Sequence, residues 1–130
     1  MAMYLLDTSA LVDWLNGVPS AAELLSRLAQ GRHTLAVCSI SVAETYSGLT
    51  EDDWPAADRV FAAFEYWDVD AETAKRAGRY RYVYARRGQP LPVTDTLMAS
   101  LAIANDATLV TGNIKDFPMP ELRLEKLPPA

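Results

Sequence analysis

The sequence predicts an α/β fold with three layers, α/β/α, around a parallel sheet of four to five strands. Short apolar runs alternate along the chain with segments whose apolar residues recur at helical spacing. Strands separated by helices pair in parallel through right-handed crossovers, and the helices then cover both faces of the sheet. The 130 residues, half of them hydrophobic, contain no linker or low-complexity tract, so we expect a single domain over residues 1–130.

Apolar runs predict the strands. The first run, residues 3–6, is entirely apolar, which is typical of a strand that is buried on both faces. Three further strands are expected along the chain, and a segment near its end is the candidate for a fifth. The expected strands are residues 3–6, 34–39, 66–69, 108–110 and 122–127.

Capping residues and helix breakers predict the helices. Thr8 or Ser9 can cap the first helix, Gly17 and Pro19 end it, and the second helix starts at Ser20. The remaining helices are expected to start at Ser41, Trp54, Asp70 and Thr94.

The helix after Asp70 has one competing interpretation. Residues 79–84 alternate with a period of two, which also fits a strand. A helix to about Arg87 is favoured because Ala77, Tyr80 and Tyr84 follow helical spacing and Asp70 supplies a cap.

Composition excludes several classes of protein. No apolar stretch approaches the length of about 20 residues that a membrane helix needs, and the N-terminus lacks the pattern of a signal peptide. The single Cys38 cannot form an internal disulfide, so we expect a core residue in a reducing, cytoplasmic protein. The single His33 is expected to be an incidental surface residue, because no catalytic partner is evident.

The basic residues are concentrated in one segment. The formal net charge is −5, yet six of the twelve basic residues lie between Lys75 and Arg87, where no acid intervenes. A local basic segment on an acidic chain indicates a binding patch for a polyanion. Tyrosines 80, 82 and 84 could stack on bases there, although a solvated helix face with inward tyrosines explains the pattern equally well. The candidates for RNA binding are Lys75, Arg76, Arg79, Arg86 and Arg87.

Four of the seventeen acids lie where local structure is expected to change. Asp7, Glu44 and Asp116 each follow a predicted strand within a few residues, and Asp95 opens a predicted helix. Ligands of open parallel sheets bind outside the carboxyl ends of the strands, where these acids can converge. Clustered carboxylates repel one another, and a hard divalent cation such as Mg²⁺ or Mn²⁺ relieves that repulsion. This arrangement suits metal-assisted hydrolysis of a phosphodiester.

Four segments resemble the motifs of the PIN domain family, in the expected order over nearly the whole chain. They are residues 5–11 around Asp7, 38–44 ending at Glu44, 94–102 around Asp95 and 107–117 around Asp116. The length is that of the VapC-type toxins of toxin–antitoxin pairs. The resemblance implies a PIN-like fold and a metal-dependent endoribonuclease.

The resemblance also implies roles for individual residues. Asp7, Glu44, Asp95 and Asp116 match the acidic quartet, as catalytic residues and as ligands of Mg²⁺ or Mn²⁺. The positions that support the site are Thr8, Ser9, Thr111 and Asn113. The implied reaction is attack of a metal-activated water on phosphorus, which leaves a 5′-phosphate and a 3′-hydroxyl.

The same resemblance implies protein partners. A cognate antitoxin would fill a hydrophobic groove with a helix, and the toxin would form a homodimer that can join a larger toxin–antitoxin assembly. Aromatic residues are plentiful in the first half of the chain, most of them expected in the core and some in such a groove. They are Trp14, Trp54, Phe61, Phe64 and Trp67.

Three other classes of protein compete with this interpretation. A haloacid-dehalogenase-type phosphatase needs a second Asp two residues after the first, where this chain has Ser9. A receiver-type signalling domain needs an acidic doublet after the first strand, which is absent, although Asp68 and Asp70 flank the third. A PIN-like domain that binds RNA without cleaving it is the remaining alternative.

Overall fold

The computed structural model describes residues 2–129 and contains one sheet of five strands, in which all neighbouring strands are parallel. The strand order is β3-β2-β1-β4-β5, so β1 is central. The predicted parallel sheet is confirmed, and the fifth strand is present. The strands are β1 (Met3–Leu6), β2 (Thr34–Cys38), β3 (Glu65–Trp67), β4 (Thr108–Thr111) and β5 (Arg123–Lys126).

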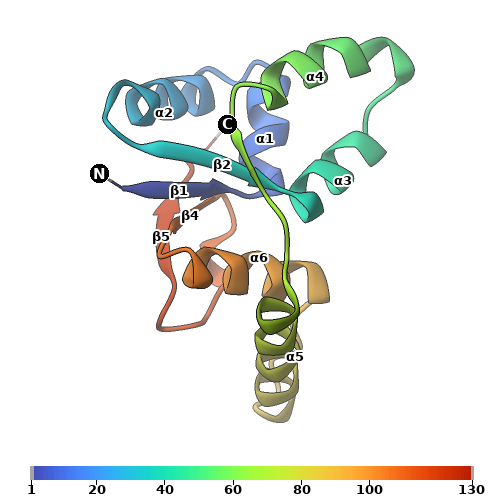
Figure 1. Ribbon diagram of the computed structural model, residues 1–130, viewed down its shortest axis with the longest axis vertical. Coiled ribbons are helices and arrows are strands. Elements are labelled where there is room, and N and C mark those ends of the chain that lie inside the picture. Colours follow the sequence, from blue (N-terminus) through green and yellow to red (C-terminus); the bar gives the residue numbers. More distant parts are fainter. Residues whose placement is uncertain (1, 130) are drawn as a thin grey trace.

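Within residues 2–129, six α-helices surround the sheet. Figure 1 shows α5 and α6 below the sheet and α1, α2 and α4 above it, which confirms the three-layer prediction. Residues 79–84 lie within α5, so the helical interpretation of that segment is confirmed. The helices are α1 (Thr8–Leu15), α2 (Pro19–Gln30), α3 (Ser39–Ser47), α4 (Trp54–Phe61), α5 (Ala71–Arg86) and α6 (Val93–Ala104), with short 3₁₀ turns η1 (Glu51–Asp53) and η2 (Ile114–Asp116).

Alternate residues of the central strands form the two halves of the core. Leu5 and Leu109 pack on the α5–α6 side, whereas Leu6 and Val110 pack on the α1–α2 side. All four side chains are fully buried. Successive side chains of a strand point to opposite faces of a sheet, so a strand that is covered on both faces must be apolar throughout.

The cap of α1 differs from the prediction. Asp7 lies at the N-cap, where its side chain accepts a hydrogen bond from the backbone N–H of Ala10. Thr8 and Ser9, the predicted caps, are the first two residues of the helix. A carboxylate caps at least as well as a hydroxyl, and the prediction overlooked Asp7 because it was assigned to metal binding.

Two other helices begin earlier than predicted. Helix α3 begins at Ser39, so Ser41 lies within its first turn, where its hydroxyl accepts a hydrogen bond from the backbone N–H of Cys38. Helix α6 begins at Val93, directly after Pro92, and Thr94 is therefore not its cap. Both helices start at the residue that follows an extended one, which leaves almost no loop between strand and helix at α3.

Several bounds of helices and strands also differ from the predicted ones. Pro19 opens α2 rather than ending α1, as suits a residue without a backbone N–H in the first turn of a helix. Strand β3 is Glu65–Trp67 instead of 66–69, and α4 ends at Phe61. The 3₁₀ turns were not predicted from the sequence.

The predicted burial is confirmed for Cys38, the only cysteine, and differs for His33, the only histidine. Cys38 is fully buried, as predicted. His33 is half-buried rather than a surface residue, because its ring packs edge-on against Tyr4 and its Nδ1 accepts a hydrogen bond from the backbone of Ala2 at 3.2 Å. Between residues 2 and 129, no helix is both long and apolar enough to cross a membrane.

Candidate active site

Asp7 lies at the point where the two central strands end together. Leu6 pairs with Val110, and the backbone N–H of Asp7 donates to the carbonyl of Val110 at 3.1 Å. The side chain of Asp7 is 4% exposed, and its Oδ1 accepts hydrogen bonds from the hydroxyl of Ser9 at 2.6 Å and the N–H of Ala10 at 3.0 Å. Burial raises the pKa of Asp7, and these hydrogen bonds oppose that rise.

The predicted supporting residues connect Asp7 to the end of β4. Hydrogen bonds from Ser9 and Thr111 favour the ionised form of Asp7 and so act to lower its pKa. The hydroxyl of Ser9 also accepts a hydrogen bond from the N–H of Gly112 at 3.0 Å. The N–H of Asn113 donates to the hydroxyl of Thr111 at 3.0 Å, so Asn113 supports this network through its backbone.

Glu44 reaches the same place from α3. It is exposed, and its Oε1 accepts a hydrogen bond from the hydroxyl of Thr8 at 2.6 Å. Strand β2 runs beside β1, and α3 starts at Ser39 as soon as β2 ends. The close succession of strand and helix therefore brings Glu44 beside the first turn of α1, as the four-acid prediction requires.

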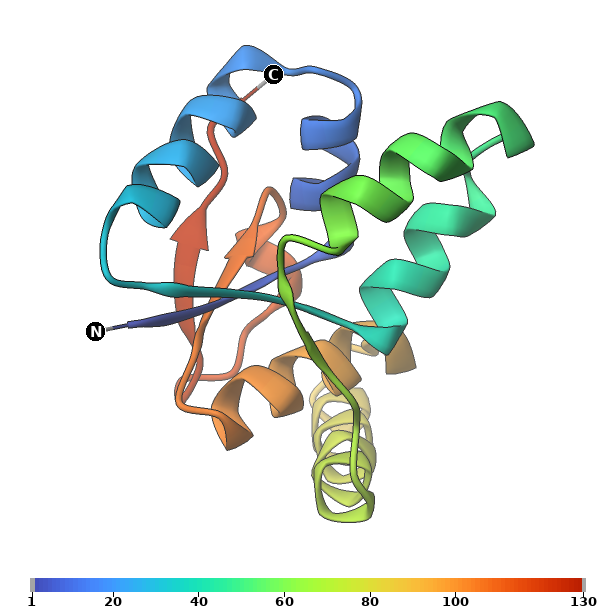
Figure 2. The same ribbon diagram turned by 45° about the horizontal axis from the view of Figure 1, so that its top comes forward.

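Asp95 shows that the four acids converge. It lies half-buried in the first turn of α6, whose beginning Figure 2 shows close to the beginning of α3. Burial raises the pKa of Asp95 to about 6, aided by the negative charges of Asp116, Glu44 and Asp7 in that order. All four predicted acids therefore lie near enough for the charges of the other three to act on Asp95.

Asp116, the last of the four acids in the sequence, completes the group. It lies exposed on η2, and its backbone N–H donates to the carbonyl of Asn113 at 2.9 Å. The sequence left open that this loop could turn Asp116 away from the site. Instead, Asp116 has the strongest charge effect on the pKa of Asp95. The two acids line a hollow of about 210 Å³ together with Gln89, Pro90, Leu91, Pro92 and Lys115.

The negative charge of the group is not balanced by ion pairs. The two ion pairs within residues 2–129, Lys75–Glu72 and Arg123–Asp106, involve none of the four acids. Their donor atoms are all carboxylate oxygens, the ligands that hard divalent cations prefer. Uncompensated repulsion and an all-oxygen donor set both fit a bound divalent cation.

The carboxylates are gathered but not yet closed into a ligand cage. Among the described residues, no three His, Cys, Asp or Glu side chains lie close enough to one another to hold an ion as they stand. Asp116 is exposed, Glu44 is exposed but accepts a hydrogen bond from Thr8, and buried Asp7 is fixed by its hydrogen bonds.

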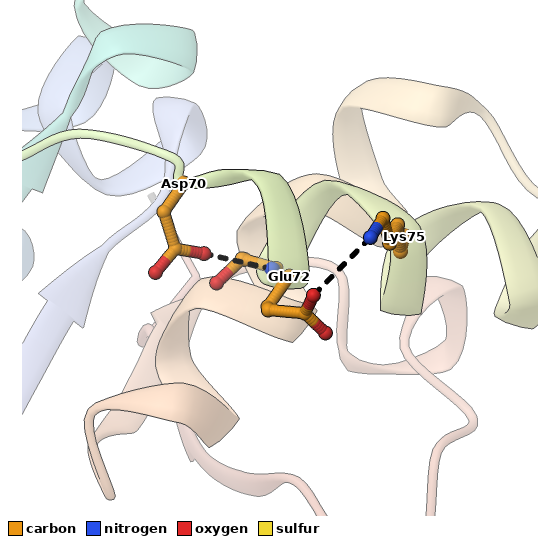
Figure 3. A network of polar contacts seen from close by, with 4 residues as sticks. Asp70, Glu72 and Lys75 are labelled. Atoms are coloured by element: carbon orange, nitrogen blue, oxygen red, sulfur yellow. Dashed lines mark hydrogen bonds and ion pairs between the residues drawn. The ribbon is translucent and has the colours of Figure 1, made fainter.

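The predicted basic residues lie along α5 and differ in their contacts. The ammonium group of Lys75 pairs with Glu72 at 3.2 Å, and Figure 3 shows this pair near the start of the helix. The guanidinium of Arg86 lies over the ring of Tyr82 at 3.3 Å. Another set lines a hollow of about 360 Å³ against the loop after η2: Arg76, Arg79, Tyr80, Val83, Tyr84, Arg87, Pro120 and Glu121.

Asp70 acts as a helix cap, as expected from its position. Its carboxylate accepts a hydrogen bond from the backbone N–H of Thr73 at 2.8 Å, and this bond lowers the pKa of Asp70 (Figure 3). The carboxylate that a receiver-type domain would need after β3 is therefore engaged at the start of α5. This contact weakens the receiver alternative.

Most of the aromatic residues in the first half of the chain belong to the core. Trp67 is buried, and Trp14, Phe61 and Phe64 pack against the α1–α2 half of the core. Trp54 is the exception, with 43% of its surface exposed.

A smaller hollow of about 150 Å³ between α1 and α3 adjoins the site and is lined by Val12, Leu15, Asn16, Glu44, Thr45, Gly48 and Leu49.

Sequence reasoning missed one charged residue of the site. Lys115 shares the hollow of Asp95 and Asp116 but was not among the predicted residues. Its place directly before Asp116 was the available signal, since a cation beside an acidic ligand can reach the same phosphate.

Comparison with a family model places this geometry among known proteins. The model described as "PIN domain" matches residues 4–118, a span that includes all four acids.

Individual proteins agree with that match. Ribonuclease VapC19 of Mycobacterium tuberculosis is 34% identical over 122 residues, which cover 93% of this chain and 98% of that protein. Ribonuclease VapC2 of Rickettsia felis is 33% identical over 129 residues, covering 95% and 96% respectively. The crystal structure of VapBC2 from Rickettsia felis bound to a DNA fragment from their promoter superimposes with a TM-score of 0.83 at 34% identity, covering 95% of this chain and 98% of that one.

Proposed function

The chain belongs to the PIN domain family, and from that premise we propose that it is an endoribonuclease of the VapC kind, the toxin of a toxin–antitoxin pair. One observation carries the proposal above all others. The other three acids all act on Asp95, which lines one hollow with Asp116, while Thr8 joins Glu44 to the helix turn that follows Asp7. Such a site suits the hydrolysis of a phosphodiester in RNA.

The cofactor is a divalent metal ion, on which PIN ribonucleases generally depend, and here we propose Mg²⁺ or Mn²⁺. Asp7 and Asp95 would be the principal ligands, with Glu44 and Asp116 completing the set. When bound, such an ion lowers the pKa of water and stabilises charge on the phosphate oxygens.

The protein residues orient the site. Ser9 and the N–H of Ala10 hold the carboxylate of Asp7 in one position. The hydroxyl of Thr8, in the first turn of α1, holds Glu44 in the same way. Burial raises the pKa of Asp7, and these hydrogen bonds act against that rise and favour the carboxylate form that would bind a cation. Lys115 is placed to neutralise charge on the substrate phosphate.

The partners follow from the same assignment. RNA is the substrate, and the related VapBC2 structure contains both members of a toxin–antitoxin pair. We place the cognate antitoxin over the hollow between α1 and α3, where exposed Val12 offers apolar surface and Glu44 forms part of the wall. A homodimer within a larger toxin–antitoxin assembly, a single nuclease domain over residues 1–130 and a cytoplasmic location complete the proposal.

The test compares wild type with Asp7→Asn and Asp95→Asn on total cellular RNA, with Mg²⁺, with Mn²⁺ and with EDTA. Wild type should cleave only with metal, and both variants should be inactive. Asp70→Asn is the matched control, because it removes a carboxylate at another helix start and asparagine caps helices equally well. Cleavage by all four proteins at the same rate would overturn the assignment of the site.

A further inference from the structure

We propose that the hollow along α5 binds the phosphates of the RNA strand that flanks the cleaved bond, through Arg76, Arg79 and Arg87. This inference rests on the proposed ribonuclease function. It divides the basic residues of α5 into those that bind RNA and those that do not.

The contacts of the basic residues make this division. Lys75 is paired with Glu72, and Arg86 is stacked on Tyr82. Arg81 donates from Nε to the backbone carbonyl of Leu91 at 3.0 Å, which fixes it against the loop before α6. These three side chains are engaged by the protein itself. Arg87 also lies near an aromatic ring, that of Tyr84, but its guanidinium carbon is 5.2 Å from the ring centre, against 3.3 Å for Arg86 over Tyr82.

The other arginines share one face of the helix. Arg76, Arg79 and Arg87 recur at the three- and four-residue spacing that aligns side chains along a helix, with Val83 between them. None of the three forms an ion pair within residues 2–129. From the first to the last they span about 16 Å at 1.5 Å per residue, a row of guanidinium groups suited to successive phosphates.

Two tyrosines fix the opposite wall of the hollow. The hydroxyl of Tyr84 donates to the carbonyl of Pro118 at 3.2 Å, and the hydroxyl of Tyr80 donates to Glu121 at 3.1 Å. Because both bonds join α5 to the loop after η2, the hollow keeps its width without a ligand. A preformed site loses less entropy on binding than one that must be assembled.

The hollow is connected to the acids through two segments of chain. Pro118 follows Asp116 by two residues, so the loop that carries the last acid continues into the wall of the hollow. At the end of α5, Arg87 leads into residues 89–92, which line the neighbouring hollow of Asp95 and Asp116. A strand whose phosphate lies at the acids can therefore continue past Lys115 and Arg87 onto α5.

Charge favours RNA as the occupant. Outside the segment from Lys75 to Arg87, the chain carries 6 basic and 17 acidic residues, so most of its surface repels a polyanion. The hollow presents three arginines against the single Glu121. An acidic peptide of a protein partner would also be attracted, but only the substrate must pass from the acids across this face.

The experiment uses two matched double variants in the full-length Asp7→Asn protein, which keeps RNA intact. Arg79→Gln with Arg87→Gln removes two charges from the hollow, and Lys75→Gln with Arg86→Gln removes two charges from the same helix outside it. Binding of a fluorescein-labelled single-stranded RNA is measured in EDTA from about 50 to 200 mM salt. Circular dichroism checks that both variants are folded.

The hollow variant should weaken binding and flatten the plot of log K against log salt by about 1.4, since each lost contact to single-stranded RNA accounts for about 0.7. The other variant should keep the parental slope. Equal changes in both variants, or no change in the hollow variant, would overturn the proposal. An unchanged slope with weakened binding of the antitoxin would also overturn it, in favour of a protein partner. Because no cleavage is measured, failure here is separate from failure of the ribonuclease assignment.

Discussion

The hydroxyl of Thr8 donates a hydrogen bond of 2.6 Å to Oε1 of Glu44 and so connects the first turn of α1 to α3. Glu44 is exposed, and this bond is what limits the rotation of its side chain. The orientation of one candidate ligand therefore depends on a residue that is not itself acidic.

Replacing Thr8 tests that dependence. Thr8→Val should lower the affinity for Mn²⁺ and the rate of RNA cleavage about 10- to 100-fold, the usual effect of losing a partner that orients a metal ligand. Mn²⁺ binding is measured by electron paramagnetic resonance and cleavage on a fluorogenic RNA. Thr8→Ser keeps the hydroxyl and should restore both; equal losses in the two variants would contradict an orienting role.

Metal binding should depend on pH through Asp95. Its pKa is raised to about 6, and only the ionised carboxylate binds a cation. Affinity for Mn²⁺ should therefore be constant above about pH 7 and fall as pH drops through 6, by about tenfold per unit for one competing proton. Titrations between about pH 5 and 8 measure this. A midpoint near pH 4 would contradict the raised pKa of Asp95 and so both of its causes, burial and the charges of the other acids.

The stability of the metal-free protein should fall as pH rises and Asp95 ionises, whereas the affinity for metal rises. The pKa of Asp95 is higher in the folded chain than its ordinary value of 3.8, so the folded state binds more protons between those values. The ionised group therefore destabilises the fold above pH 6, and this effect disappears as pH falls towards 4. In EDTA, Asp95→Asn should raise Tm by about 3 °C at pH 7.5 and leave it unchanged near pH 4.

Ser9 should contribute to stability as well as to the site. Ser9→Ala removes the hydrogen bond to Asp7 and leaves the N–H of Gly112 without its partner. The expected loss is about 1–3 kcal/mol in the free energy of unfolding, measured by urea denaturation, together with reduced cleavage. Ser20→Ala is the control, because the hydroxyl of Ser20 makes only an exposed bond to the carbonyl of Pro129. A similar loss in both variants would mean that Ser9 has no special role.

The central strands and the acids that follow them were predictable for one physical reason. A strand covered on both faces must be apolar, so β1 and β4 stand out in the sequence, and any acid at their ends is conspicuous. Asp7 and Asp116 were found in this way. Parallel pairing then places such ends at one edge of the sheet.

Other features depend on contacts between distant segments and were not predictable. The edge strand β3 has exposed residues such as Tyr66, so its apolar pattern is weak and its bounds shifted. The division of the basic residues of α5 depends on the loop after η2, through Tyr80 and Tyr84. No local pattern in α5 says which arginines that loop will face.

Asp7 accepts the hydrogen bonds from the hydroxyl of Ser9 and the N–H of Ala10 on the same oxygen, Oδ1. Oδ2 would therefore be the oxygen that these two bonds leave for a cation. An asparagine at this position has one carbonyl oxygen, which the helix start claims, and its amide NH₂ then faces the place of the ion. Asp7→Asn thus exchanges an acceptor for a donor where the charge is needed, while α1 keeps its cap.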